Sequence, residues 1–341
     1  MATTRRVALL FPGQGSQYPR MAAGLYGQVE VFTDTMDQAF ESLGHLGVKL
    51  RDEWRSERPG ALFDDVVRAQ PLLYAVEYAL GRTVLDWGVR PAAMLGHSVG
   101  EMVAATLSGV LSFSSGLRLM LDRVEQYAAT PPGGMLAVAA SAADVTAHLT
   151  GTLAIAAVNA EQQTVVAGER AELAALTRTL RDRGFTCVAV RANQAFHSPV
   201  VAGAARRSVD AWSAVSLRPP HTRLYSARLG AVLGSAAAVD PAFWAMQPAA
   251  PVLFWPTLDL LLRDESVLLV EVGPGQGLIT LARRHPALQS GHCDAVGLLP
   301  ARAAGPDAEL AALRAAADRL AADGHIRPGA AAPSIEARSG V

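Results

Sequence analysis

The spacing of hydrophobic residues in the first third of the chain predicts alternating strands and helices. The apolar run 6–11, RVALLF, predicts a first strand. Residues 71–88 carry hydrophobic side chains at helical intervals, and the short apolar run 92–95 predicts a second strand. From 99 to 107 the hydrophobic positions again follow helical spacing. This alternation favours an α/β fold.

One serine lies between the second strand and the helix that follows it. Ser98 stands in the sequence GHSVG, flanked by Gly96 and Gly100. Glycines at these positions remove the side chains that would obstruct a sharp turn from strand to helix. Such a turn can present a nucleophilic serine, although a tight turn without catalytic function has the same composition.

The pattern changes between residues 134 and 196. Predicted strands and helices follow one another there as β-α-β-β-α-β, the ferredoxin-like order. We therefore expect a small domain, 134–196, inserted into a large domain made of 1–133 and 197–326. Residues 327–341 are rich in Ala, Pro, Ser and Gly and are expected to form a disordered tail.

Composition excludes several classes of function. The chain has 341 residues, 50% of them hydrophobic, and a formal net charge of −1, which argues against binding nucleic acid through bulk charge. Cys187 and Cys293 have no CxxC spacing, so we expect neither a disulfide framework nor a metal site. The sequence contains no long uncharged apolar stretch, so we expect no membrane span and a cytoplasmic protein.

A nucleophilic serine requires a base and an anion-binding site. His97 adjoins Ser98, but on a strand its side chain points to the opposite face, which disfavours it as the base. His197 lies in ANQAFHSPVV, where the inserted domain returns to the large one, and is a better candidate. The glycine-rich segment 11–17, FPGQGSQ, allows its backbone to approach a ligand, and the absence of a following Lys-Ser/Thr disfavours a P-loop.

Several motifs occur together in a characteristic order. They are FPGQGSQ at 11–17, QPLLYAVEYAL at 70–80, GHSVGE at 96–101, Arg123, AFHS at 195–198 and EVGPGQGL at 271–278. The set resembles the malonyl-CoA:acyl carrier protein transacylases and the acyltransferase domains of polyketide synthases, from about residue 6 to about residue 300. The resemblance implies an α/β-hydrolase-like large domain with an inserted ferredoxin-like small domain.

The resemblance also implies roles for individual residues. Ser98 would be the nucleophile and His197 its general base. A carbonyl group would orient the imidazole in place of an acid, and Gln247 occupies the matching position. The backbone N–H groups of Gln14 and Val99 would form the oxyanion hole.

Two further residues bear on the acyl group. Arg123 follows Ser98 by 25 residues, where malonyl-type members carry the arginine that binds the free carboxylate. Phe196 resembles the bulky residue that narrows the pocket toward malonyl. The sequence departs from the family pattern at Ala249 and at 124–127, and these departures leave the exact acyl group open.

The expected function is therefore malonyl transfer from coenzyme A to the phosphopantetheine thiol of an acyl carrier protein. A ping-pong seryl-ester mechanism would serve polyketide or fatty acid biosynthesis, in a discrete, monomeric, trans-acting S-malonyltransferase without metal or cofactor. Three alternatives stay open: transfer of another acyl group between carriers, acyl-thioester hydrolysis by the same Ser/His pair, and a non-catalytic docking module. Candidate arginines for the anionic carrier are Arg178, Arg181, Arg183, Arg191, Arg206 and Arg207.

Overall fold

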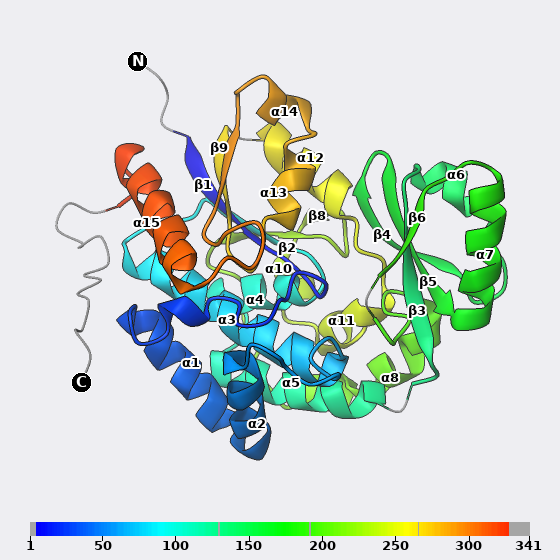
Figure 1. The fold of residues 1–341 in the computed structure, drawn as a ribbon, viewed down its shortest axis with the longest axis horizontal. Helices are drawn as coiled ribbons and strands as arrows, with labels where there is room; N and C mark the ends of the chain where they lie inside the picture. The colour runs from blue at the N-terminus through cyan, green and yellow to red at the C-terminus, as the bar shows by residue number, and fades with distance from the viewer. Residues whose placement is uncertain (1–4, 129, 191, 265, 327–341) are drawn as a thin grey trace.

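Two β-sheets organise the protein. The computed structural model describes residues 5–128, 130–190, 192–264 and 266–326, so the expected tail at 327–341 lies outside the described residues. Within those residues the larger sheet has six strands and the smaller has four, and Figure 1 shows the smaller sheet at one side of the larger unit. The strands of the larger sheet, in order across it, are β10 (Asp294–Gly297), β9 (Val267–Glu271), β1 (Arg6–Phe11), β2 (Ala93–Gly96), β7 (Arg223–Ser226) and β8 (Ala231–Val232).

The larger sheet is buried on both faces. Its neighbouring strands pair in parallel except β7 with β8, which is antiparallel. Along β1, Val7, Leu9 and Phe11 join one hydrophobic core, while Ala8 and Leu10 join the other. This division follows from the two-residue period of a strand.

Helices supply the partners of both faces. The first core contains residues of α1 (Glu30–Ser42), α2 (Gly44–Arg55), α3 (Val66–Asp86), α4 (Val99–Leu107), α5 (Phe113–Ala128), α9 (Val209–Ser213), α10 (Ser235–Ala238), α11 (Pro241–Ala245) and α15 (Pro306–Ala322). The second contains residues of α12 (Phe254–Asp264), α13 (Gly277–Ala282) and α14 (Pro286–Gln289). A sheet with helices on both faces is the doubly wound arrangement.

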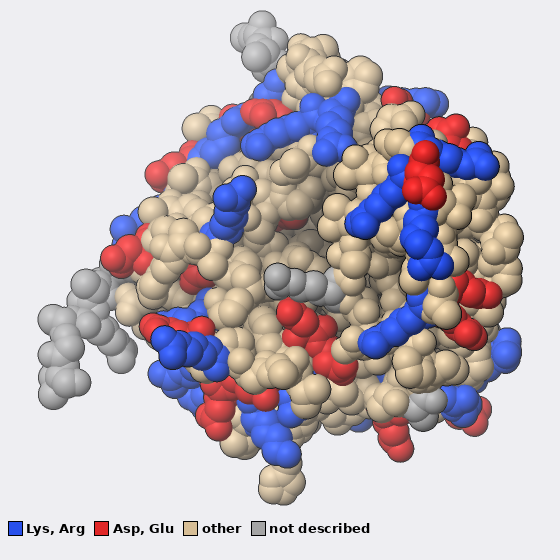
Figure 2. Space-filling model, turned by 45° about the vertical axis from the view of Figure 1, so that its right-hand side comes forward, with Lys and Arg blue, Asp and Glu red and all other residues tan. Residues whose placement is uncertain are grey.

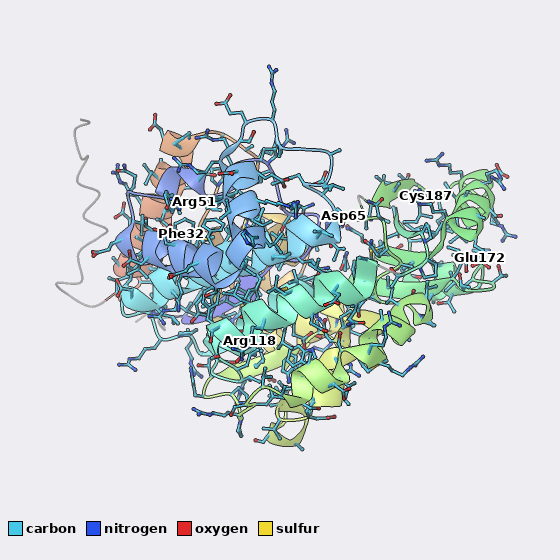
Figure 3. All side chains as sticks on the ribbon, turned by 90° about the horizontal axis from the view of Figure 1, so that it is seen from below. Phe32, Arg51, Asp65, Arg118, Glu172 and Cys187 are labelled. Carbon is cyan, nitrogen blue, oxygen red and sulfur yellow. The ribbon has the colours of Figure 1, made fainter. Side chains whose placement is uncertain are left out.

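Helix α3 begins earlier than its hydrophobic spacing predicts. The spacing indicates a start at residue 71, but α3 starts at Val66 because the Asp65 side chain accepts a hydrogen bond from the Val67 N–H at 3.1 Å. Pro71 therefore lies inside the helix. Figure 3 shows Asp65 on the side of the large domain that faces the small one, where Asn193 donates to it at 3.1 Å.

The smaller sheet belongs to the segment expected to be an insertion. Its elements are β3 (Gly133–Val138), α6 (Ala142–Thr146), β4 (Ala154–Ala160), β5 (Gln163–Glu169), α7 (Arg170–Asp182) and β6 (Cys187–Val190), in the sheet order β4-β5-β3-β6 with antiparallel pairing. Residues of α6 and α7 cover one face of this sheet. The predicted fold class, a large α/β unit with a ferredoxin-like unit, is confirmed.

Strand β4 joins the two units and is irregular where it does so. The Val158 N–H donates to the Val252 carbonyl at 2.9 Å, and the Val252 N–H donates to the Ala156 carbonyl at 2.8 Å. The pairing of β4 with β5 shifts in register between Val158 and Ala160. A bulge of this kind redirects a side chain, and it turns Asn159 into the cleft between the units.

Candidate active site

The site is built at the ends of the parallel strands β1 and β2. Ser98 lies two residues after the end of β2 and has φ 56° and ψ −118°, a conformation that non-glycine residues rarely adopt. A Cβ atom at Gly96 would lie 2.1 Å from the Glu101 nitrogen, and one at Gly100 would lie 2.2 Å from the Phe11 carbonyl oxygen. The two glycines are therefore required by close packing, and Ser98 projects from the turn between them.

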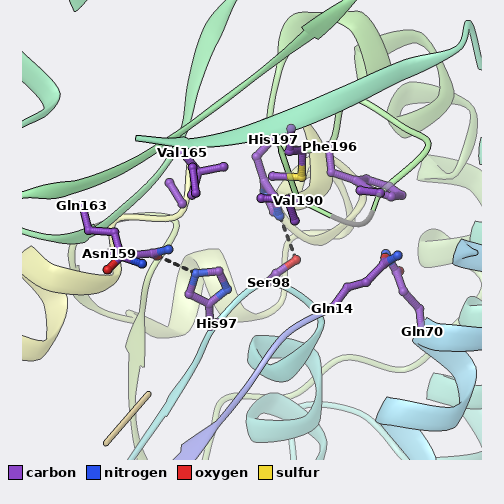
Figure 4. Close-up of a pocket in the computed structure, with 14 residues that line it drawn as sticks. Gln14, Gln70, His97, Ser98, Asn159, Gln163, Val165, Val190, Phe196 and His197 are labelled. Atoms are coloured by element: carbon purple, nitrogen blue, oxygen red, sulfur yellow. Dashed lines mark hydrogen bonds between the residues drawn. The ribbon is translucent and has the colours of Figure 1, made fainter. Parts of the chain in front are cut away.

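His197 reaches Ser98 from the far side of the inserted segment. The Ser98 Oγ and the His197 Nε2 lie 2.7 Å apart, as Figure 4 shows. The His197 Nδ1 lies 2.7 Å from the Ala250 carbonyl oxygen, which can only accept, so Nδ1 carries the proton. Nε2 of the neutral ring is therefore free to accept the Ser98 proton.

The carbonyl that orients this imidazole is that of Ala250, and the expectation for Gln247 needs correcting. Gln247 begins a short 3₁₀ turn, Gln247–Ala249, which directs the carbonyl three residues further on at the Nδ1 atom. The Gln247 carbonyl makes a smaller contribution that favours the protonated form of His197 and so raises its pKa. The Gln247 side chain instead donates from Nε2 to the Ser98 carbonyl oxygen at 2.8 Å. Gln247 thus ties the turn that carries Ser98 to the segment 247–250, which also contacts His197.

The surroundings of His197 favour its neutral form. Burial lowers the pKa of the imidazole to about 3, against the raising effect of the Ala250 carbonyl, and the nearby Arg123 charge lowers it further. His197 is also held at φ 61°, with its own N–H donating to the Pro248 carbonyl at 2.6 Å. The ring is therefore a fixed, unprotonated base at neutral pH.

Two backbone N–H groups beside the serine have no hydrogen-bond partner among the described residues. Val99 is the first residue of α4, and Gln14 lies in the loop after β1. Neither N–H donates a hydrogen bond to another of the described residues. A Cβ atom at Gly13 would lie 3.2 Å from the Ser98 Cβ, so this loop lies directly against the turn. The arrangement suits an anion that develops beside Ser98.

Arg123 is buried close enough to His197 for its charge to act on the imidazole. Its side chain lies on α5 and the residue is 6% exposed. Its Nη1 donates to the Gln70 Oε1 at 3.2 Å, and among the residues that the structure describes it forms no ion pair. Burial lowers the pKa of the guanidinium, yet arginine keeps its proton in proteins. A buried charge without a counter-ion is costly, so this one is suited to an anionic ligand.

Phe196 lies on the wall of the cavity beside the dyad. It packs against Tyr127, with ring centroids 5.2 Å apart. Tyr127 is buried one helical turn after Arg123, and its hydroxyl has no hydrogen-bond partner among the described residues. Burial raises the pKa of Tyr127 to about 12, so the hydroxyl stays protonated. The departure from the family pattern at 124–127 therefore places a neutral donor behind Phe196.

One cavity contains the Ser98–His197 dyad in its lining, and a second cavity adjoins it. The inner cavity, about 190 Å³, is lined by Gln14, Gln70, His97, Ser98, Met135, Ala137, Ala157, Asn159, Gln163, Val165, Val190, Ala192, Phe196 and His197. The outer cavity, about 510 Å³, shares His97, Asn159, Gln163 and Gln14 with it. These four polar residues mark a passage between the cavity at Ser98 and the outer cavity.

His97 and Asn159 form one wall of this passage. The His97 Nε2 lies 2.8 Å from the Asn159 Oδ1, and His97 forms no bond with Ser98. Nothing in the local sequence pattern signals the bulge in β4 that brings Asn159 here. Gln163 lines both cavities and accepts a hydrogen bond from Arg284 at 3.2 Å.

Basic side chains border the hollow that Figure 2 shows. Arg284 and Arg302 line the outer cavity, and sequence reasoning missed both. Arg178 and Arg181 lie on α7, which covers the face of the small sheet away from the cleft. Arg183 follows α7, Arg206 and Arg207 end α8 (Ala202–Arg207), and Arg191 lies outside the described residues.

Over the ranges 5–128, 130–190, 192–264 and 266–326, no group of three or more His, Cys, Asp or Glu side chains could hold a metal ion. Over the same ranges no helix has both the length and the apolar character to cross a membrane.

Comparison with known proteins identifies the family. Residues 8–317 match the family described as the acyl transferase domain. Among curated relatives, a phenolphthiocerol/phthiocerol polyketide synthase of Mycobacterium tuberculosis is 37% identical over 297 residues, 85% of this chain and 20% of that protein. The spectinabilin polyketide synthase system protein NorB of Streptomyces orinoci is 31% identical over 90% of this chain and 14% of its own length. The chain thus spans a fifth or less of these two relatives.

Solved structures agree with this assignment. The acyl transferase domain of SpnD, in complex with 2-(pent-4-yn-1-yl)malonyl, has a TM-score of 0.88 and 32% identity, covering 98% of this chain and 79% of that one. FabD from Acinetobacter baumannii, at 24% identity, shares the fold with a TM-score of 0.81 over 94% of this chain and 99% of its own. With a paired serine and histidine, two unpartnered N–H groups and a match along most of its length, the chain belongs to the acyl transferase domain family.

Proposed function

We propose that this acyltransferase moves a malonyl group from coenzyme A to the phosphopantetheine thiol of an acyl carrier protein. The observation that carries the proposal is the buried Arg123, without an ion pair among the described residues, next to the Ser98–His197 pair. A malonyl thioester has an electrophilic carbonyl for the serine and a free carboxylate for the arginine. The names of the relatives, which are polyketide synthases, support a place in polyketide biosynthesis.

In the first half-reaction the serine takes the acyl group. The Ser98 hydroxyl gives its proton to the His197 Nε2 while Oγ bonds to the thioester carbonyl carbon. The resulting oxyanion accepts hydrogen bonds from the Gln14 and Val99 N–H groups. The C–S bond then breaks, the sulfur leaves with the proton from His197, and the malonyl group remains on Ser98 as an ester.

The second half-reaction reverses these steps with a different thiol. The carrier's phosphopantetheine thiol gives its proton to His197, and the sulfur attacks the ester carbonyl. When the C–O bond breaks, His197 returns the proton to the Ser98 Oγ. Every proton passes through one imidazole, so the proposed cycle uses no metal or redox cofactor.

The outer cavity suits the anionic parts of both substrates. Coenzyme A and a carrier-bound phosphopantetheine arm both carry phosphate, and Arg284 and Arg302 line that cavity. Guanidinium groups bind phosphate through paired hydrogen bonds. We propose these two arginines as phosphate contacts, in place of those on α7.

The two enzymatic alternatives make different demands on the site. A neutral acyl chain transferred between carriers would leave the Arg123 charge unpaired, which the burial of that residue disfavours. A hydrolase would need water at the ester, and it would use the same Ser98–His197 pair, so it differs from the transferase in what becomes of the ester.

The test is the intact mass of the protein after brief mixing with malonyl-CoA. We expect a malonyl adduct in the wild type and none in Ser98→Ala. Arg123→Ala should lose the malonyl adduct and accept acetyl from acetyl-CoA. An adduct only with a carrier-bound acyl chain would favour the first alternative, and release of malonate without an adduct would favour the hydrolase.

A further inference from the structure

A chain of hydrogen bonds connects Arg123 with the loop that carries Gln14. The Arg123 Nη1 donates to the Gln70 Oε1 at 3.2 Å, and the Gln70 Nε2 donates to the Gln14 Oε1 at 3.0 Å. The Gln14 Nε2 in turn donates to the Asp64 carbonyl oxygen at 3.0 Å. In both glutamines the amide oxygen accepts on the side nearer to Arg123, and the amide nitrogen donates on the other side. Figure 4 shows the side chains of Gln14 and Gln70 pointing at each other.

Gln70 contacts both Arg123 and Gln14. It is 2% exposed, stands on α3 and lines the inner cavity. Its amide oxygen is the only hydrogen-bond partner of Arg123 among the described residues, so it fixes where the guanidinium points. Its amide nitrogen holds the side chain of Gln14, in the loop that packs against the Ser98 turn. A buried amide with both groups bonded has few other orientations.

We propose that Gln70 is a positioning residue that determines acyl specificity, because it couples occupation of Arg123 by a free carboxylate to the placement of the Gln14 oxyanion donor. This inference rests on the proposed function. When a carboxylate binds Arg123, the guanidinium is held from both sides, and the chain through Gln70 fixes the loop after β1. An acyl group without a carboxylate leaves the Arg123 guanidinium held by Gln70 alone. Gln70 thereby links recognition of the substrate's acid group to stabilisation of the reacting carbonyl.

The variant Gln70→Glu tests this directly. It is nearly the same size and places a carboxylate about where the amide oxygen now contacts Arg123, so the protein itself pairs with the guanidinium, and it also removes the N–H donor to the Gln14 Oε1. We expect the ratio of malonyl to acetyl uptake on Ser98, from malonyl-CoA and acetyl-CoA, to fall by about tenfold or more. A melting temperature close to that of the wild type would show that the variant folds.

A second variant separates the coupling from a merely structural role. Gln70→Ala keeps the Arg123 charge but breaks the chain, so the malonyl reaction should lose kcat while KM changes little. A purely structural role would reduce malonyl and acetyl transfer alike. The matched control is Gln126→Glu. Gln126 lies on the same helix as Arg123 and accepts a hydrogen bond from Arg207 at 2.9 Å, so this variant also places a carboxylate beside an arginine. That control should keep the wild-type ratio.

The outcomes distinguish this inference from the proposed function. If the wild type forms no malonyl ester, the proposed function fails and this inference falls with it. If the wild type forms the ester and Gln70→Glu keeps the wild-type preference, only the role of Gln70 is overturned. Equal losses for both acyl groups in Gln70→Ala would also overturn it.

Discussion

At the scale of single residues, the reacting pair depends on backbone conformations that are rare for side chains larger than glycine. Ser98 and His197 both have positive φ, at 56° and 61°. Such conformations cost about 1–3 kcal/mol each and persist only where the surrounding contacts impose them. Here the Gln247 side chain holds the Ser98 carbonyl, and the Pro248 carbonyl holds the His197 N–H. The strain is therefore stored where the oxygen and the nitrogen must meet.

The lowered pKa of His197 predicts an unusual pH profile for acylation of Ser98. The base works only when unprotonated, and burial brings its pKa to about 3. We expect the rate of ester formation to stay nearly constant as the pH falls from about 8 to about 5. Rapid-quench mass spectrometry measures that rate.

The control for this profile is His45→Gln, which removes an exposed histidine and should give the same curve. A half-maximal rate near pH 6.5 in both proteins would show that the imidazole titrates at its ordinary pKa.

At the scale of elements, the junction of β2 with α4 sets the position of the nucleophile. The backbone of α4 passes so close to Gly96 that no side chain fits between them, and the loop after β1 packs against Gly100. Helix α4 is buried along its whole length, so it cannot move outward to relieve a clash. The junction thus behaves as one rigid piece.

We predict that Gly96→Ala strongly impairs acylation. The new Cβ would lie 2.1 Å from the Glu101 nitrogen, so the first turn of α4 must shift. A displacement of the reacting atom by about 1 Å can reduce rate by about 10²-fold, and we expect a loss of that order together with a lower melting temperature. Single-turnover acylation and thermal unfolding measure the two effects.

Gly60→Ala is the matched control, because a Cβ there meets nothing within 4 Å. If Gly96→Ala behaves like Gly60→Ala, the junction tolerates a side chain and the packing argument fails.

Much of this framework could be predicted from local sequence, whereas the contacts across it could not. Hydrophobic spacing identifies β1, β2 and α4, and the glycines around Ser98 identify the turn, because these signals lie within a few residues of each other. The roles of Gln70 and Asn159 depend on partners 53 and 62 residues away. The carbonyl of Ala250 was missed because a 3₁₀ turn decides which oxygen faces the histidine.

At the scale of the whole molecule, two buried acids, Glu271 on β9 and Glu77 on α3, lie close enough to interact. Glu271 ends β9 and accepts hydrogen bonds from the Leu278 and Ile279 N–H groups at 3.0 and 2.9 Å. Glu77 on α3 is fully buried, and neither of its carboxyl oxygens has a hydrogen-bond partner among the described residues. Burial raises the pKa of Glu271 to about 7, and burial together with Glu271 raises the pKa of Glu77 well above its usual range.

These acids predict that stability falls as the pH rises. A carboxyl whose pKa is raised in the folded state binds more protons there than in the unfolded chain, so its stabilisation is complete below about pH 4.5 and is lost as the pH rises through the folded value. Buried His197 has the opposite effect below its ordinary pKa of 6.5, so we expect the free energy of unfolding to fall between about pH 6.5 and pH 8. Denaturant titrations at several pH values measure it.

Glu77→Gln should flatten this dependence and raise the stability at pH 8, since it removes one of the two interacting acids. Glu41→Gln, at an exposed position on α1, should leave the slope as in the wild type. Parallel slopes for all three proteins would mean that the buried pair does not control the pH response.

The pairing of the first and last strands of the insertion has a consequence for how the site assembles. Ser98 and His197 are 99 positions apart, and closing so long a loop in an unfolded chain carries an entropy cost that grows with the logarithm of its length. Met135 pairs with Val190, and the Gly133 N–H bonds to the Asn193 carbonyl at 3.0 Å, so the folded insertion returns the chain to the point where it left. The folded small domain therefore bridges the stretch from Gly133 to Asn193, so that only the segments from Ser98 to Gly133 and from Asn193 to His197 separate nucleophile and base along the chain.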